Sequence, residues 1–229
     1  MKKYLFTTLV ACLALTHVLL AQTRTEERSL RNFSKIKVAN SIEVELRKGD
    51  SPSASITANG IDLDKIITEV SKETLDVKLG RGNFRSSTVK MVITYTELDE
   101  IAAATSASVV VKDLLDASQV VLAATTSGYI EAEVSTETLF LDATSSSKIF
   151  VEGSTDLLNL KVFTSAEVDA EKLKANRAEV QGNTAGRATF EVANEITGSA
   201  ATGARIRYIG NPSRIEVRTG TGGTVEKND

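Results

Sequence analysis

The chain has 229 residues, a quarter of them charged, and a formal net charge of −3 from 27 basic and 30 acidic side chains. It contains one histidine, one cysteine and no tryptophan. The mildly acidic balance, with no stripe of basic residues, argues against a nucleic acid as partner.

Residues 1–21 have the pattern of a secretory signal peptide. Lys2 and Lys3 precede an apolar run over 5–20, and the small residue Ala21 ends the segment. The run is too short to predict a transmembrane span. The letters LVAC at 9–12 resemble a bacterial lipobox, but the apolar run continues beyond Cys12, so we do not expect a lipoprotein. Cleavage after Ala21 removes the cysteine and His17, so no disulfide is expected in the exported chain.

Residues 22–32 read as a short linker, and residues 33–97 as a β-rich region. Alternating patterns predict strands over 33–39, 42–49, 53–58, 74–80 and 88–96, separated by turn residues. The segment 61–70 predicts a short helical turn that leads into a strand. Because an open strand edge invites association with other chains, we expect this region to cap the strands that begin near residue 98.

From residue 98 to 225 one short signature recurs seven times: a Thr or Ser, two small residues, a variable residue and usually an aliphatic one. The starts of the copies lie 18 to 21 residues apart. The copies are TSASV (105–109), TSGYI (126–130), SSSKI (145–149), TSAEV (164–168), TAGRA (184–188), TGARI (202–206) and TGGTV (221–225). A fixed period of this size is typical of a solenoid.

Alignment of the seven copies predicts columns of stacked residues. The alternation of apolar and polar positions within each copy indicates strands with one face inward. The fold class expected is therefore all-β: a β-helix of seven coils of about 19 residues over 98–225, with a polar tail at 226–229. One predicted inward column is Ile101, Leu122, Leu141, Leu160, Val180, Gly198 and Val217.

The signature also predicts how each coil turns its corner. Stacked coils lie roughly 4.8 Å apart, so a corner residue meets its own equivalents above and below. This explains the small residues Ala107, Gly128, Ser147, Ala166, Gly186, Ala204 and Gly223. The Thr/Ser column that starts each copy is expected to point inward as a ladder of hydrogen-bonded hydroxyls. The alternative is an outward array that orders water or binds ice.

The opening FSKIKVANSIEVELRKGD, the middle IITEVSKETLDVKL, the T-S-[AG]-x-[VI] repeats and the late YIGNPS together carry a resemblance. Over about 33–225 the chain resembles the putative auto-transporter adhesin head GIN domain family, formerly a domain of unknown function and widespread in Bacteroidetes. The resemblance implies a right-handed, single-stranded β-helix and, from the family's name, adhesion. It supplies no catalytic residues.

Without histidine or cysteine, the exported chain lacks the parts for a nucleophilic triad or a Cys/His zinc site. Carboxylate chemistry remains, and Asp142, Glu152, Asp169, Glu171 and Arg187 are the candidates for an outward catalytic face. The alignment stacks Asp142 with Ala123 and Lys161, and it stacks Glu133, Glu152 and Glu171 as an acidic column. That column suggests at most a weak calcium site. We expect an ordinary solvated face and assign no catalytic, cofactor-binding or metal residue.

Phe140 and Phe163 fall on outward positions and would form a small contact patch for sugar or protein, unless an N-terminal element covers them. The function expected is an exported, non-catalytic binding, adhesion or scaffold module in the periplasm, at the outer-membrane surface or outside the cell. A surface glycan or an envelope protein is the partner considered. The alternative is a polysaccharide lyase or hydrolase that uses carboxylates or calcium, and a sensing role is a third possibility.

Overall fold

The computed structural model describes residues 23–84 and 86–228, in which one 3₁₀ helix accompanies 17 strands. No helix in these residues is long and apolar enough to cross a membrane. The elements are β1 (Arg24–Ser29), β2 (Lys35–Val38), β3 (Glu43–Lys48), β4 (Ser53–Asn59), η1 (Leu63–Lys65), β5 (Ile66–Ser71), β6 (Thr74–Leu79), β7 (Thr88–Tyr95), β8 (Glu100–Ala104), β9 (Ser108–Val111), β10 (Leu115–Thr125), β11 (Tyr129–Thr144), β12 (Lys148–Val162), β13 (Glu167–Gly182), β14 (Arg187–Ala200), β15 (Arg205–Ile209), β16 (Arg214–Thr219) and β17 (Thr224–Lys227).

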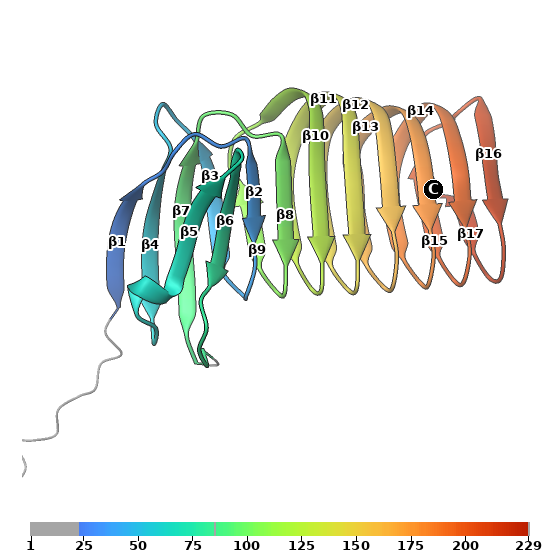
Figure 1. Cartoon of the computed structure of the whole chain (residues 1–229). Coiled ribbons are helices and arrows are strands. Elements are labelled where there is room, and N and C mark those ends of the chain that lie inside the picture. Colours follow the sequence, from blue (N-terminus) through green and yellow to red (C-terminus); the bar gives the residue numbers. More distant parts are fainter. Residues whose placement is uncertain (1–22, 85, 229) are drawn as a thin grey trace, which may run out of the picture.

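The strands wind into a right-handed β-solenoid. In Figure 1 the strands on the near side run downward, the chain returns upward behind them, and the coils advance from left to right. Equivalent strands of successive coils pair in parallel, as in β11 with β12 and β12 with β13. The expected fold class and the expected handedness are both confirmed.

Each coil contributes to two faces. The first face consists of β5, β6, β2, β8, the second halves of β10–β14, and β16, in that spatial order. The second face consists of β1, β4, β7, β3, β9, the first halves of β11–β14, β15 and β17. The long strands β11–β14 therefore cross from the second face to the first at a bend, and the short corner of the signature returns the chain to the second face.

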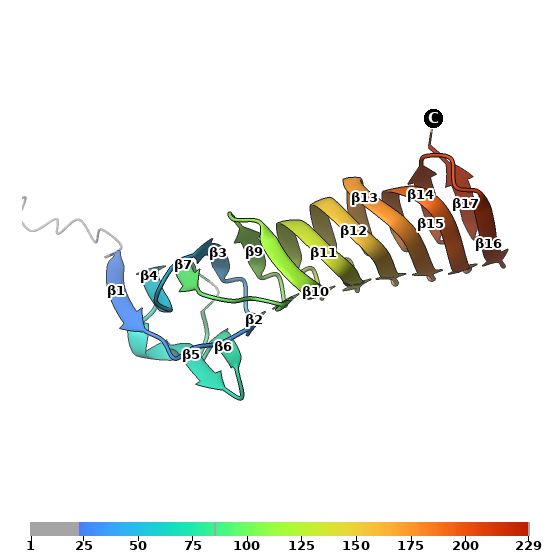
Figure 2. The same ribbon diagram turned by 90° about the horizontal axis from the view of Figure 1, so that it is seen from above.

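The N-terminal region extends the solenoid and then closes it. β2 pairs in parallel with β8 and β3 with β9, so these two strands add a rung before the repeat. Beyond them, β6 and β7 extend the ladders by another step, and β5, β4 and β1 end them with antiparallel pairs. Figure 2 shows this closure at one end of the stacked coils. The five predicted strands of this region and the helical turn before β5 are confirmed.

The prediction of a short linker over 22–32 is wrong, because β1 lies within it and pairs with β4 along its whole length. β1 also places an arginine against the outermost strand of the first face. The Arg28 guanidinium donates to the backbone carbonyls of Ile66 at 2.6 Å and Leu63 at 2.8 Å, and the Arg31 guanidinium donates to that of Val70. Side chains thus satisfy the carbonyls of Ile66 and Val70 on β5, which has no further strand beside it among the described residues.

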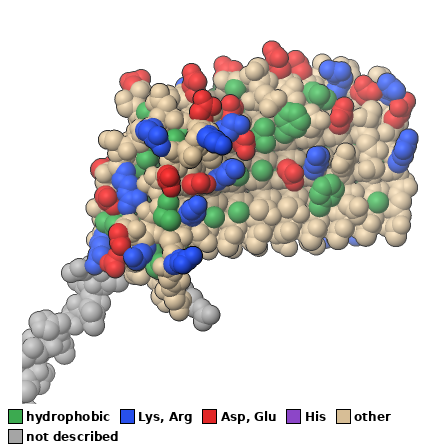
Figure 3. All heavy atoms as spheres, in the orientation of Figure 1, with side chains coloured by type: hydrophobic (Ala, Val, Ile, Leu, Met, Phe, Trp, Pro, Cys, Tyr) green, Lys and Arg blue, Asp and Glu red, His purple; other side chains and the backbone are tan. Residues whose placement is uncertain are grey.

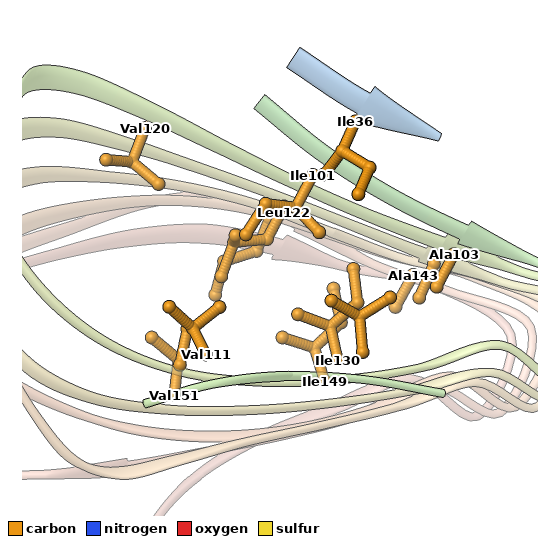
Figure 4. Packing of buried hydrophobic residues seen from close by; sticks show 14 of the residues in the cluster. Ile36, Ile101, Ala103, Val111, Val120, Leu122, Ile130, Ala143, Ile149 and Val151 are labelled. Carbon is orange, nitrogen blue, oxygen red and sulfur yellow. The ribbon is translucent and has the colours of Figure 1, made fainter. Parts of the chain in front are cut away.

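The core is the space between the two faces. Ile101, Leu122, Leu141, Leu160 and Val180 stack in register along the first face and are at most 1% exposed. Across from them lie Ile130 and Ile149 of the second face, and Figure 4 shows the two layers pointing toward one another. The predicted inward column is therefore confirmed from Ile101 to Val180, while Gly198 and Val217 at its C-terminal end are only half-buried. The core is one continuous apolar layer.

The corners differ from their prediction in one respect. The Thr/Ser column is exposed or half-buried and lies in the left-handed backbone region, with φ between 41° and 55°. This conformation turns the side chain outward, so an inward hydroxyl ladder is wrong. The next residue is left-handed too in all seven copies, and its N–H donates to the corner carbonyl of the following coil, as from Ser106 to Thr126 at 2.9 Å and from Ser165 to Thr184 at 2.9 Å. These bonds offset a backbone strain of roughly 1 to 2 kcal/mol per residue.

The third corner position is small because a backbone carbonyl of the preceding coil lies beside it. A Cβ at Gly128 would sit 2.2 Å from the carbonyl oxygen of Ala103, and one at Gly186 would sit 2.3 Å from that of Val162. The corners contain no charged residue, and in Figure 3 they form the largely tan lower edge of the solenoid.

Candidate functional site

The bends opposite the corners form a groove that runs along the solenoid. It measures about 560 Å³ and is lined by residues of β10–β14, so it follows five successive coils. Its lining is polar: Asp116, Ser118, Ser135, Glu137, Ser154, Asp156, Lys174 and Asn176 stand beside Thr136, Thr155 and three alanines. We call this feature the axial groove.

Two threonines explain why the chain bends here. The Thr136 hydroxyl lies 3.0 Å from the carbonyl oxygen of Ser118 in the preceding coil and 3.2 Å from that of Thr138. Thr155 repeats the arrangement one coil later with Glu137 and Leu157, at 3.4 and 3.2 Å. Each hydroxyl donates to carbonyls at a bend, where regular strand pairing is interrupted. The flanking side chains are thereby turned outward into the groove.

Successive coils all contribute polar side chains to the axial groove, and the residue type changes from coil to coil. Asp116, Glu137 and Asp156 place carboxylates on three consecutive coils, and Lys174 places an ammonium group on the fourth. Asp156 and Ser154 are exposed, so their oxygens are open to solvent. Carboxylates and hydroxyls arranged along one line can accept and donate many hydrogen bonds to a long ligand.

A second hollow continues the axial groove at its N-terminal end, because Asp116 and Ala117 line both. This end pocket measures about 340 Å³ and combines Leu98, Leu114 and Leu115 with the polar side chains of Lys48, Tyr95 and Asp99. Tyr95 is only 2% exposed, whereas Leu114 is 43% exposed. Burial, reinforced by the negative charge of Asp113, raises the pKa of the Tyr95 hydroxyl to about 12.

The five candidates for an outward catalytic face are not all gathered into one site. Asp142 lies on the first face between Ala123 and Lys161, as predicted, while Glu152, Asp169, Glu171 and Arg187 belong to the second face. Three of them, Asp169, Glu171 and Arg187, line a hollow of about 330 Å³ together with Glu167, Arg205 and Arg207. Glu152 instead pairs with Lys172 at 3.6 Å.

The predicted acidic column is only partly correct. Glu133 and Glu152 are in register, but the pairing of β12 with β13 shifts between Phe150 and Gly153, so Glu171 does not follow Glu152 in the ladder. The extra residue of this coil forms a bulge there. Within residues 23–84 and 86–228 no group of three or more His, Cys, Asp or Glu side chains is placed to hold a metal ion.

The prediction that Phe140 and Phe163 lie at outward positions is confirmed. Phe140 is 36% exposed on the first face, and Phe163 is half-buried at an outward position near a corner. Phe190 is fully buried, and the Lys172 ammonium lies 6.0 Å from the ring centre of Phe150. Neither Phe140 nor Phe163 lines the axial groove or the end pocket.

The axial groove and the end pocket were missed by the sequence reasoning. A signal for the groove exists: Ser135–Thr136 and Ser154–Thr155 interrupt the alternation of apolar and polar residues midway between corners. The end pocket has no such signal, because its walls come from β3, β7, the segment before β8 and β10.

Comparison with known proteins supports the architecture. A putative adhesin from Bacteroides fragilis superposes with a TM-score of 0.81 at 18% identity, over 90% of this chain and 97% of that one. A putative adhesin from Parabacteroides merdae gives 0.76 at 16% identity, over 92% and 98%. A putative lipid binding protein from Parabacteroides distasonis gives 0.74 at 20% identity, over 92% and 98%. No curated protein matches the chain.

At these identities the structural neighbours establish the fold alone. The family is established separately, because a family model matches residues 32–212, most of the chain. That match spans the N-terminal closure and nearly all of the coils. The chain therefore belongs to the family described as putative auto-transporter adhesin, head GIN domain.

Proposed function

We propose that this protein is an exported, non-catalytic adhesive module of the bacterial cell envelope that binds an extended glycan along the axial groove. The observation that carries the proposal is the groove itself, an open hollow of about 560 Å³ that follows five coils and is lined by polar side chains and alanines. The family description and the adhesin-like neighbours support a binding role.

The length of the groove favours a polymer as ligand. Successive coils are spaced roughly 4.8 Å apart, so a chain lying along the axis meets a further set of polar groups at each coil. Sugar hydroxyls both donate and accept, which suits a lining of carboxylates, hydroxyls and an amide. Solenoids are rigid and supply long surfaces of this kind for partners.

A blocking substitution tests the site. Ser154 is exposed on the groove, and Ser199 is an exposed strand serine on the first face, outside the groove. We expect Ser154→Trp to weaken binding of any glycan selected on an array by about tenfold or more, and Ser199→Trp to leave it unchanged, with melting temperatures preserved in both. Equal binding by the two variants, or an array without a binding glycan, contradicts the proposal.

The location and the absence of turnover are tested separately. If the protein is exported, cell fractionation finds it in the periplasm, on the surface or in the medium, with Gln22 as the mature N-terminus. Recovery of the uncleaved chain in the cytoplasm contradicts export.

Incubation with the bound glycan should produce no new reducing ends or unsaturated products. Product formation that is lost on Asp169→Asn or Arg187→Gln would instead support the enzyme.

A further inference from the structure

The end pocket contains two buried polar atoms that the protein does not satisfy. Among the described residues, neither the hydroxyl oxygen of Tyr95 nor Oδ1 of Asp99 has a hydrogen-bond partner. Both residues line the same hollow. Buried polar groups are nearly always paired, because an unpaired one has lost its bonds to water without replacement. Two such atoms in one pocket leave two hydrogen-bonding positions open to a bound molecule.

The Tyr95 hydroxyl and Asp99 Oδ1 need different hydrogen-bond partners. The Tyr95 hydroxyl is protonated at physiological pH, since the reference pKa of tyrosine is 10.0 and burial raises the pKa further, so it can donate a hydrogen bond. The Asp99 carboxylate oxygen is an acceptor and needs a donor. The ligand group must therefore carry an acceptor and a donor together.

The rest of the pocket adds an apolar requirement. Leu98 and Leu115 are buried in its wall, and Leu114 is one of the few large hydrophobic side chains exposed in the described part of the chain. When a ligand covers an exposed leucine beside a pocket, the burial of apolar surface stabilises the complex. A small apolar group next to the acceptor and the donor meets this requirement.

We propose that the end pocket binds the acetamido group of an N-acetylated sugar, located at one end of the glycan in the axial groove. Its carbonyl accepts from the Tyr95 hydroxyl, its N–H donates to Asp99, and its methyl group lies against the leucines. The assignment rests on the proposed function, because Asp116 and Ala117 line both the pocket and the groove.

An acetylated lysine carries the same group, but the surroundings favour a sugar. The pocket shares Asp116 and Ala117 with a groove lined by carboxylates and hydroxyls, which provides partners for the ring hydroxyls of the following units. Asp116 at the junction offers an acceptor to a hydroxyl of the sugar that enters the pocket.

The test compares tetramers of N-acetylglucosamine, glucose and glucosamine, all β-1,4-linked, by calorimetry with the whole chain. These ligands share a β-1,4-linked backbone and differ only in the substituent at C2 of each sugar, which the pocket is expected to recognise. We expect the acetylated tetramer to bind about tenfold or more tightly than the glucose tetramer, as is typical when a site pairs otherwise unpaired polar groups. The glucosamine tetramer should not exceed the glucose tetramer by this margin.

Tyr95→Phe removes the donor and keeps the ring. We expect the variant to lose the preference for the acetylated tetramer while its melting temperature stays the same or rises, because the deleted hydroxyl has no partner in the protein. If the Tyr95 hydroxyl instead stabilised the fold, its removal would lower the melting temperature. Tyr208→Phe, in a distant coil, is the control and should retain the preference.

The outcomes separate the two proposals. If the acetylated and glucose tetramers bind equally, the acetamido assignment is wrong while glycan binding in the groove stands. A preference for glucosamine would show attraction by the acidic residues instead, and binding of an acetyl-lysine peptide in place of the tetramers would overturn the choice of a sugar. If neither tetramer binds while other glycans on the array do, only the acetamido assignment fails. If no glycan binds, both proposals fail.

Discussion

The side-chain hydroxyl of Ser147 donates a hydrogen bond of 2.7 Å to the backbone carbonyl of Ala124 in the preceding coil. Ser147 occupies the buried corner position that is glycine or alanine in the other coils of the repeat. At Gly128 and Gly223 the equivalent carbonyl leaves no room even for a Cβ. The same carbonyl thus excludes a side chain in some coils and binds one here.

Ser147→Ala should therefore lower the free energy of unfolding by about 1 kcal/mol, the usual worth of one buried hydrogen bond. Ser146→Ala changes the adjacent corner residue, which is exposed. It should shift stability by less than about 0.5 kcal/mol. Urea denaturation of the two variants is the measurement, and equal effects would contradict the role given to the buried hydroxyl.

Val180 and Gln181 are neighbours in β13 with opposite surroundings. Val180 is fully buried in a stacked column, and Gln181 is exposed beside Lys161 of the preceding coil. Val180→Asp should cost about 4 kcal/mol or more, since it buries a charge without a partner. Gln181→Asp should change stability by less than about 0.5 kcal/mol. Thermal unfolding distinguishes them, and similar melting temperatures would show that the inward column is misassigned.

Arg28 should stabilise the N-terminal closure. Its guanidinium donates to two backbone carbonyls near β5 and to the Thr68 hydroxyl at 3.0 Å, and it pairs with Glu26 at 2.8 Å. Arg28→Ala should cost about 2 kcal/mol, because hydrogen bonds to a charged group are lost at a partly buried site. Hydrogen exchange should accelerate in β5 and β6. Arg24→Ala, which removes an exposed pair with Asp62, should leave this exchange unchanged.

Stability should decrease at alkaline pH. The pKa of Tyr95 and that of Tyr129 are both raised to about 12, chiefly by burial, so the fold favours the neutral hydroxyl. This contribution is complete below the reference value of 10.0 and is lost as the pH rises from there through the folded pKa. The free energy of unfolding should therefore be lower at pH about 11 than at pH about 8, and Tyr95→Phe should reduce the difference. An unchanged difference in that variant would contradict the role of Tyr95.

The architecture could be predicted because the repeat places equivalent residues at one height in every coil. Columns such as that of Ile130, Ile149 and Val168 follow from alternation together with a constant period. The failure at Glu171 has a physical reason. The coil that starts at Thr164 has one residue more than its predecessor, and the sequence does not show where the chain accommodates it.

The orientation of the corner threonines could not be derived from their spacing. A side chain at a corner points inward or outward according to its φ angle, and β-branched residues seldom adopt the left-handed region that Thr126 and Thr164 adopt here. The end pocket was beyond prediction for a different reason. Its walls come from 95–99, 114–117, Ser34 and Lys48, which lie far apart in the sequence, and the pairing of β3 with β7 and β9 fixes where Lys48 lies.

The insertion of β2 and β3 determines where the chain can be divided. β2 lies between β6 and β8, and β3 lies between β7 and β9, although both precede β4–β7 in the sequence. A fragment that starts at residue 98 would lose the neighbours of its first two strands and expose their backbone edges. A fragment of residues 33–97 would likewise leave β2 and β3 without β8 and β9. Shortened versions of this protein should therefore remove coils from the C-terminal end, where each coil depends only on the one before it.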